Sequence, residues 1–168
     1  MYQRIILILL IILMLIATKL NGQNPNFSYP YNYSKIVFVS RVIDGDTFVL
    51  SDSSRVRMLG VDCPEAARFS KPAEPFAEQS TALIKSLIEH KTVKLTFDGK
   101  AFDMFGRQLA YVWLRNAKGN DSIFVQAELL KNGFARISYY TQEKRFYALF
   151  YNLRNTARQK HLGIWSNE

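Results

Sequence analysis

Apolar residues form one unbroken run near the N-terminus and then recur at regular intervals through the rest of the chain. The run covers Ile5–Ala17, behind Arg4 and ahead of the polar stretch that follows Lys19. It is shorter than the roughly 20 residues that span a bilayer, and its flanks are typical of an export signal. We therefore interpret residues 1–22 as a cleaved signal peptide, with a retained membrane anchor as the alternative, and the Asn- and Pro-rich residues 23–33 as a linker.

Five later segments have the β-branched, aromatic or alternating composition of strands. They are Ile36–Ile43, Thr47–Leu50, Val56–Val61, Thr92–Phe97 and Leu109–Leu114. Turn residues at Asp44-Gly45 and at Asp52-Ser53-Ser54 separate the first three, which predicts a meander. The folded domain is therefore expected to cover residues 34–168.

Three helices are predicted between and after these strands. Apolar residues at helical spacing follow Pro75, which suits the first turn of a helix. A short helix is expected over Ile123–Asn132, with Ser122 as its cap and Gly133 at its end, and a longer one over Gln142–His161. Together these elements indicate an α+β fold, a five-stranded OB-type β-barrel with about three helices.

Composition and charge narrow the classes of partner. A chain of 168 residues with 48% hydrophobic content can build one packed core. Its net charge is +8, or +6 once residues 1–22 and their two cations are removed, and this excess favours polyanions such as nucleic acid. Cys63 is the single cysteine, which excludes an intramolecular disulfide, and a zinc site is disfavoured because the sequence has no Cys/His cluster. His90 and His161 are expected at helix C-termini, where a cation is electrostatically favoured, so a catalytic histidine is not expected.

The stretch Arg57–Glu65 places a cation and two carboxylates in an otherwise apolar, strand-like run. Burying them unpaired would cost several kcal/mol or more, so they need partners such as a metal ion and a phosphate. Arg57 and Asp62 have opposite parity in a regular strand and can face one site only if the strand bends between them. Gly60 is suited to such a bend.

Two further segments carry candidate chemistry. Asp44-Gly45-Asp46-Thr47 taken alone indicates a turn, and it is not an EF-hand because Arg55 would occupy the position that requires glutamate. The segment Asp103–Arg107 enters the last predicted strand. In combination, five charged residues supply hard oxygen ligands, a base for water and cationic clamps, which phosphodiester hydrolysis requires. These residues are Asp46, Arg57, Asp62, Glu65 and Arg107.

At this point the chain resembles the staphylococcal (thermo)nuclease family, from about Lys35 to Glu168. The similarity lies in ordered motifs with matching gaps. They are Val42-Ile43-Asp44-Gly45-Asp46-Thr47, the stretch Arg57 to Glu65, Phe105-Gly106-Arg107-Gln108-Leu109-Ala110-Tyr111, and the closing Leu162-Gly163-Ile164-Trp165-Ser166.

The resemblance implies a role for each matching residue. Asp46, Asp62 and the backbone carbonyl of Cys63 would bind one Ca²⁺, with water and substrate completing the shell. Glu65 would orient and deprotonate the attacking water, while Arg57 and Arg107 would stabilise the pentacoordinate phosphorus. The implied activity is cleavage of DNA and RNA on the 5′-oxygen side, which leaves 3′-phosphates.

Several positions depart from the family pattern. Met104 and Phe105 stand where the family often has Lys-Tyr, so a cation and a hydroxyl that would contact a terminal phosphate are lost. Tyr139 matches a base-stacking tyrosine, but the second such position is Thr141, with Tyr140 between them. These changes concern binding of nucleotide ends and affinity rather than the hydrolytic step.

Alternatives remain open at this stage. A non-catalytic OB-type module could bind single-stranded nucleic acid through Tyr139 and Tyr140, although it would not need the paired acids. The expected location is secreted or periplasmic, or the membrane surface if residues 1–22 are retained, and nothing calls for a stable protein partner or more than a monomer. A row of aromatic and basic residues on the last helix indicates either a solvated helix flank or an extended nucleic-acid surface. It consists of Tyr147, Tyr151, Arg154 and Arg158.

Overall fold

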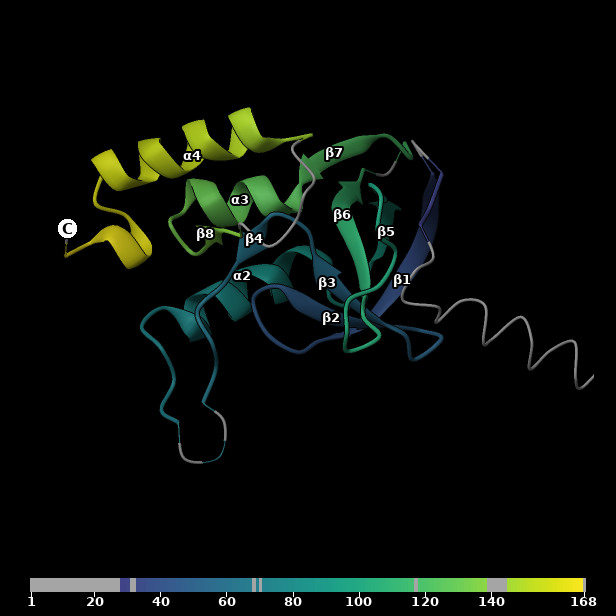
Figure 1. Ribbon diagram of the computed structural model, residues 1–168, viewed down its shortest axis with the longest axis horizontal. Helices are drawn as coiled ribbons and strands as arrows, with labels where there is room; N and C mark the ends of the chain where they lie inside the picture. The colour runs from purple at the N-terminus through teal and green to yellow at the C-terminus, as the bar shows by residue number, and fades with distance from the viewer. Residues whose placement is uncertain are drawn as a thin grey trace, which may run out of the picture.

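The computed structural model describes residues 28–30, 33–67, 69, 71–116, 118–138 and 145–167. Within them, five strands form a closed barrel (Figure 1). The strands are β1 (Ser34–Val42), β2 (Thr47–Leu50), β3 (Arg55–Met58), β5 (Thr92–Thr96) and β6 (Gln108–Arg115). Neighbours pair in the order β3-β2-β1-β5-β6, and a parallel pairing of β3 with β6 closes the ring, with Arg57 opposite Leu109. The predicted five-stranded OB-type barrel is confirmed.

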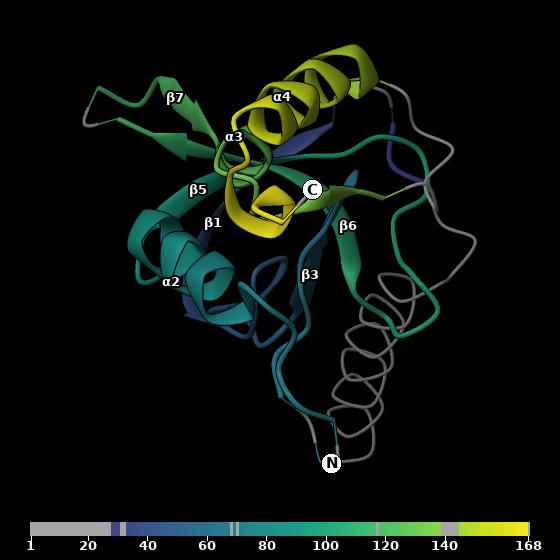
Figure 2. The ribbon, with the colours of Figure 1, turned by 90° about the vertical axis from the view of Figure 1, so that its left-hand side faces the viewer.

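Three short strands were not expected from the sequence. β7 (Asp121–Phe124) extends the sheet beyond β6 as a hairpin that projects from the barrel (Figure 2). β4 (Val61–Asp62) pairs with β8 (Arg136–Ile137). The third predicted strand therefore ends at Met58 and resumes as β4 after Gly60, whose φ is 77°. Glycine tolerates this left-handed conformation, which turns the chain out of the barrel.

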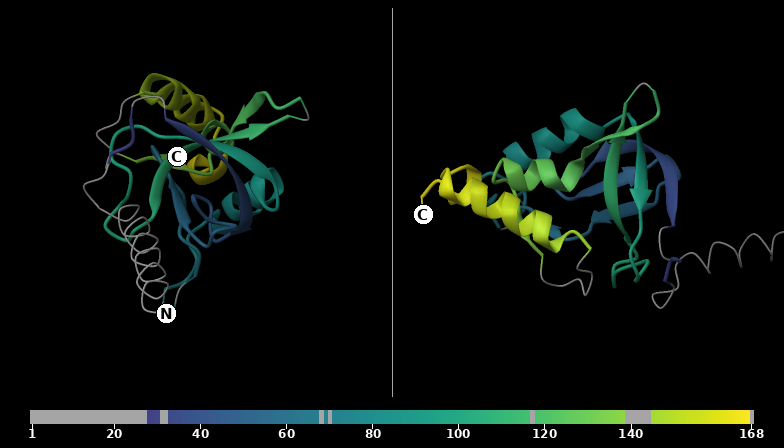
Figure 3. Two further views of the ribbon diagram at one scale, coloured as in Figure 1. Left: turned by 90° about the vertical axis from the view of Figure 1, so that its right-hand side faces the viewer. Right: turned by 90° about the horizontal axis from the view of Figure 1, so that it is seen from above.

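In the described part of the chain three α-helices gather at one end of the barrel, as the view from above in Figure 3 shows. They are α2 (Ala77–Ile88), α3 (Val125–Lys131) and α4 (Tyr147–Gln159), and a 3₁₀ turn, η1 (Gly163–Trp165), follows α4. Ser122 is not the cap of α3 as predicted. It lies in β7, where its hydroxyl donates to the carbonyl of Leu114 over 3.0 Å. Both histidines follow helix ends as expected, with φ of 57° at His90 and 52° at His161.

The core lies between the barrel and the helices. Phe48, Val56 and Leu95 from the barrel are completely buried, as are Ile84 of α2 and Leu129 of α3. A buried glutamine ties α3 to the barrel. Gln126 donates to the carbonyl of Ala110 and accepts from the N–H of Val112, both over 3.1 Å. Because both halves of its amide are hydrogen-bonded, its burial is compensated.

Among the described residues, no helix combines the length and the apolarity needed to cross a membrane. Residues 1–27 lie outside that part of the chain, as do Tyr139, Tyr140 and Thr141. The predictions for the export signal and for the stacking tyrosines therefore stay predictions.

Candidate active site

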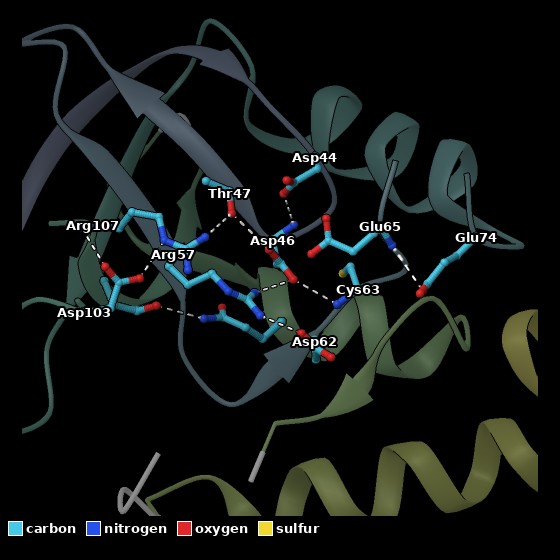
Figure 4. A network of polar contacts seen from close by, with 12 residues as sticks. Asp44, Asp46, Thr47, Arg57, Asp62, Cys63, Glu65, Glu74, Asp103 and Arg107 are labelled. Atoms are coloured by element: carbon cyan, nitrogen blue, oxygen red, sulfur yellow. Dashed lines mark hydrogen bonds and ion pairs between the residues drawn. The ribbon is translucent and has the colours of Figure 1, made fainter. Parts of the chain in front are cut away.

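An open cavity of about 850 Å³ lies where β2, β3 and the segment after β4 meet the loop before β6. All five charged residues singled out in the sequence line it: Asp46, Arg57, Asp62, Glu65 and Arg107. Four further ionisable residues, Asp44, Arg55, Lys100 and Asp103, line it as well. Figure 4 shows the polar contacts around Asp46, Arg57, Asp62, Glu65 and Arg107. The cavity therefore collects cations and carboxylates that come from distant parts of the sequence.

Arg57 joins the two aspartates of the site. Its Nη2 atom donates to Oδ1 of Asp62 over 2.8 Å, and its Nη1 atom forms an ion pair with Oδ2 of Asp46. The bend at Gly60 makes this possible because it brings Asp62 round to the face that Arg57 occupies, as strand parity required. A Cβ atom at Gly60 would lie 2.6 Å from the ring of Phe150, so α4 packs directly behind the bend.

Asp46 is the buried member of the pair, with 7% of its surface exposed. Its Oδ2 atom accepts the N–H of Cys63 over 2.9 Å, and its Oδ1 atom accepts the hydroxyl of Thr47 over 3.0 Å. Burial raises the pKa of Asp46 to about 6; Arg57 acts in the opposite direction, and the charge of nearby Asp44 adds to the rise. The ionised carboxylate is thus incompletely compensated, which favours an additional cation beside it.

Cys63 packs beneath the loop that carries Asp46. Burial, followed by the charge of Asp46, raises the pKa of its thiol well above the ordinary value, so the sulfur stays protonated. A Cβ atom at Gly45 would lie 2.5 Å from Oγ of Ser80 in α2 and 2.7 Å from Cβ of Cys63. The Asp44–Asp46 turn therefore lies against α2 at a distance that only glycine permits. The predicted role of the Cys63 carbonyl as a metal ligand stays a prediction.

Asp103 holds Arg107 in place at the other side of the cavity. Its Oδ2 atom accepts from Nε of Arg107 over 2.6 Å, and its Oδ1 atom accepts the backbone N–H groups of Phe105 and Arg107, each over 2.9 Å. Gly106, with φ of 71°, allows the chain to turn tightly between these residues. Arg107 then reaches across to donate from Nη1 to Oγ1 of Thr47 over 3.3 Å.

Glu65 lies at the end of the cavity opposite Arg107, and Figure 4 shows its carboxylate directed toward Asp46. Its backbone is held by Glu74, from the far side of the intervening loop. The N–H of Glu65 donates to a carboxylate oxygen of Glu74 over 3.3 Å, and the N–H of Glu74 donates to the carbonyl of Glu65 over 2.9 Å. The start of the loop at Glu65 and its end at Glu74 are therefore tied together.

Sequence reasoning missed three residues that position the charged groups: Thr47, Asp103 and Glu74. Thr47 and Asp103 stood inside motifs that had been singled out, but their partners depend on the fold. Thr47 contacts Arg107, which is 60 positions away. For Asp103, its spacing of four residues from Arg107 was an available signal, because a carboxylate at that distance can reach an arginine across a tight turn. Glu74 offered no comparable signal.

The residues present fit a hard divalent cation in part. Asp46 and Asp62 are oxygen donors of the kind that Ca²⁺ and Mg²⁺ prefer. The described residues contain no group of three or more His, Cys, Asp or Glu side chains arranged to hold a metal. Since Ca²⁺ takes six to eight oxygens, a cation at this place would need water and substrate as additional ligands.

Comparison with known proteins places this arrangement in context. Residues 55–167 match the family model described as Staphylococcal nuclease homologue. The chain is 32% identical to the thermonuclease of Staphylococcus intermedius over 165 residues, which cover 96% of this chain and 95% of that protein. It is 32% identical to the thermonuclease of Staphylococcus hyicus over 132 residues (77% and 75%), and 34% identical to the endonuclease YncB of Bacillus subtilis over 142 residues (80% and 64%).

Proposed function

Because this chain belongs to the staphylococcal nuclease homologue family, we propose that it is a metal-dependent nuclease that hydrolyses phosphodiester bonds of DNA and RNA. The observation that carries the proposal is the meeting of Asp46, Arg57, Asp62, Glu65 and Arg107 around one cavity. A cavity lined by carboxylates that can hold a cation, and by the guanidinium groups of Arg57 and Arg107, suits a substrate that is itself a phosphate diester. The names of the thermonuclease and endonuclease relatives support the same reaction class.

The proposed metal is Ca²⁺, held by Asp46, Asp62 and the main-chain carbonyl of Cys63. Bound there, it would supply positive charge next to the scissile phosphate. The carboxylate of Asp46 is preorganised by two hydrogen bonds, from Cys63 and Thr47, before any ligand arrives. Arg57 now engages both aspartates, so occupation of the site would free part of its guanidinium for substrate.

The other side chains perform the proton transfer and the charge stabilisation in this proposal. Glu65 takes a proton from the attacking water as a general base. Arg57 and Arg107 donate to the phosphoryl oxygens, whose negative charge grows in the transition state. A guanidinium suits this role because it is permanently charged and presents a planar fork of donors. Asp103 and Thr47 keep Arg107 aimed into the cavity.

The most informative experiment incubates the purified protein with DNA, and separately with RNA, in Ca²⁺ and then with a chelator. We expect cleavage of both substrates that stops when Ca²⁺ is chelated, and Mg²⁺ and Mn²⁺ in parallel identify the preferred ion. Cleavage that continues in chelator would refute the metal assignment. Binding of nucleic acid without cleavage in any divalent ion would favour the rival function, a non-catalytic single-strand-binding module.

Substitutions test the residue roles directly. We expect Glu65→Gln and Arg107→Ala each to lower kcat by roughly 10² or more, with an unchanged circular dichroism spectrum. A near-wild-type rate in either variant would refute the role assigned to that residue.

We also propose export through residues 1–22. Their apolar run behind Arg4 supports this location. N-terminal sequencing of the protein isolated from its cells tests it, since a start beyond residue 22 is expected and an intact Met1 would indicate a retained segment.

A further inference from the structure

A surface outside the cavity runs along α4. Tyr147, Tyr151, Arg154 and Arg158 follow one another at spacings of four, three and four residues, which places them in a straight row of about 16 Å. We call this row the α4 stripe. Tyr147 and Tyr151 are 43% and 42% exposed. The stripe lies beside the face that α4 buries, so its two tyrosine rings can contact a ligand while the helix stays packed.

The side chains of the stripe are arranged as a stacking surface. The rings of Tyr147 and Tyr151 lie 6.1 Å apart between centroids, with 30° between their planes. The guanidinium carbon of Arg154 lies 4.5 Å from the centroid of the Tyr151 ring. Arg154 is also held by Asn155, whose Oδ1 atom accepts from Nε over 3.2 Å and from Nη2 over 2.9 Å. Tyrosine and arginine faces in such a row can receive the unpaired bases of a nucleic-acid strand.

The charged side chains in the described segment that contains α4 are all basic. From Arg145 to Asn167 the sequence contains four Lys and Arg residues and neither Asp nor Glu. At the C-terminal end of the stripe lies a surface hollow of about 410 Å³, lined by Asn155, Arg158, Gln159 and His161. Each of these side chains can donate a hydrogen bond. The hollow is therefore chemically suited to the sugar-phosphate backbone of a strand whose bases stack on the tyrosines.

The stripe is connected to the candidate active site through the packing of α4. Phe150 lies against Gly60, at the bend that presents Asp62 to Arg57. Ser138, which lines the cavity, donates its N–H to the carbonyl of the same glycine over 3.1 Å. Helix α4 also packs against β8, the strand that precedes Ser138. The bend at Gly60 is therefore the contact through which α4 adjoins residues that line the cavity.

We propose that the α4 stripe binds single-stranded nucleic acid outside the cavity, as a second contact for long substrates; this rests on the proposed nuclease function and deepens it. Stacking needs unpaired bases, so the stripe favours single strands over duplex. An anionic membrane fits less well. A helix that lies on a bilayer inserts its apolar face, whereas α4 buries Phe150 and Ala157 in the protein, at 2% and 0% exposure.

Binding measurements on full-length protein test the proposal. All variants are made in a Glu65→Gln background and measured with Ca²⁺, so that cleavage during the experiment is limited. Fluorescence anisotropy gives the affinity for a 20-nucleotide single strand and, by competition, for a dinucleotide that the cavity alone can hold. Tyr147→Ala/Tyr151→Ala should weaken binding of the 20-mer at least about fivefold and leave the dinucleotide unchanged. Tyr147→Phe/Tyr151→Phe keeps the stacking faces and should bind the 20-mer like the parent.

Charge is tested by a matched pair. Arg158→Ala should reduce the slope of log Kd against log salt for the 20-mer by about one unit at most. Lys118→Ala removes one exposed charge from the β6–β7 turn and should leave the slope closer to that of the parent. Equal effects of the two substitutions would overturn the assignment of Arg158, because they would reflect net charge alone.

Two results with the double alanine variant would overturn the α4 assignment: unchanged affinity for the 20-mer, or an equal loss of affinity for the dinucleotide. A variant that loses binding only to phosphatidylserine vesicles would also overturn it, because the surface would then be a membrane contact. The nuclease function fails separately. If the wild-type protein does not cleave but the stripe variants still bind the 20-mer more weakly, the α4 assignment stands. If the protein cleaves and the stripe variants bind normally, the nuclease function stands alone.

Discussion

At Thr47 one hydroxyl group connects the two sides of the cavity. It donates to Asp46 and accepts from Arg107, over 3.0 and 3.3 Å, and the residue is 4% exposed. The aspartate and the arginine were both recognisable in the sequence from their motifs. The hydroxyl was not, because a threonine after Asp-Gly-Asp has no pattern that reveals a partner 60 positions later. At this scale the sequence identified the charged groups, and the fold was needed to find what holds them.

We expect Thr47→Val to lower kcat by roughly tenfold with little change in KM. The variant keeps the shape of the side chain but loses two hydrogen bonds to charged groups, and each such bond contributes about 1.5–3 kcal/mol. Steady-state kinetics on a single-stranded oligonucleotide measures the effect. Thr47→Ser retains the hydroxyl and serves as the control. If the serine variant is as slow as the valine variant, the connecting role is wrong.

The buried carboxylate of Asp46 makes a second residue-scale prediction, on stability in the absence of metal. Its pKa is raised from 3.8 to about 6 in the folded protein. Between pH 3.8 and about 6 the carboxyl group of Asp46 is ionised in the unfolded chain and protonated in the folded protein. The contribution of Asp46 to the free energy of unfolding therefore falls as pH rises through this window, by an amount on the order of 3 kcal/mol. Asp46→Asn cannot ionise and should therefore gain stability relative to wild type from pH 4 to pH 7.

Urea unfolding in chelator at several pH values measures this difference. Asp62→Asn is the matched control, because it removes the other carboxylate that pairs with Arg57 but its side chain is 52% exposed. A stability difference between wild type and Asp46→Asn that stays constant with pH would contradict the prediction. Equal pH dependence in both variants would show that Asp46 is not the group responsible for the effect.

The bend between β3 and β4 shows how far sequence reasoning reaches at the scale of elements. Strand parity required a bend between Arg57 and Asp62 and identified Gly60 as its position, and the structure places φ of 77° there. The sequence did not reveal that β4 and β8 each have only two residues, since so short a strand shows no alternation. It also missed that Phe150 of α4 fills the space behind the glycine, because this contact joins residues 90 positions apart.

Gly60→Ala is expected to destabilise the protein more than Gly106→Ala. Both glycines have positive φ, 77° and 71°, so both substitutions strain the backbone by about 1–2 kcal/mol. A Cβ atom at Gly106 meets nothing within 4 Å, whereas one at Gly60 would lie 2.6 Å from Phe150, which adds about 1–3 kcal/mol of overpacking. Urea unfolding of both variants gives the difference, and Gly60→Ala/Phe150→Leu should recover part of it. Equal destabilisation would mean that α4 moves away without cost.

On the scale of the whole molecule, the barrel brings the halves of the site together by closing. The parallel pairing of β3 with β6 places Arg57 opposite Leu109, two residues from Arg107. The count and composition of the strands predicted a closed barrel, but pairing between segments about 50 residues apart leaves no local signal. The same assembly sets Gly45, in the turn that carries Asp46, against both Cys63 and Ser80 of α2. The single thiol of the chain is therefore buried where the barrel, α2 and the candidate metal site meet.

Reaction of Cys63 with a thiol reagent should consequently report on the integrity of this junction. In chelator at neutral pH we expect slow labelling, since the thiol is buried and stays protonated. A cation that binds only the folded protein stabilises it by mass action, so Ca²⁺ should slow labelling further. Asp46→Asn should abolish this protection by Ca²⁺ if Asp46 is a ligand. Fast labelling of the native protein would show that α2 separates easily from the site, and protection that survives in Asp46→Asn would place the cation elsewhere.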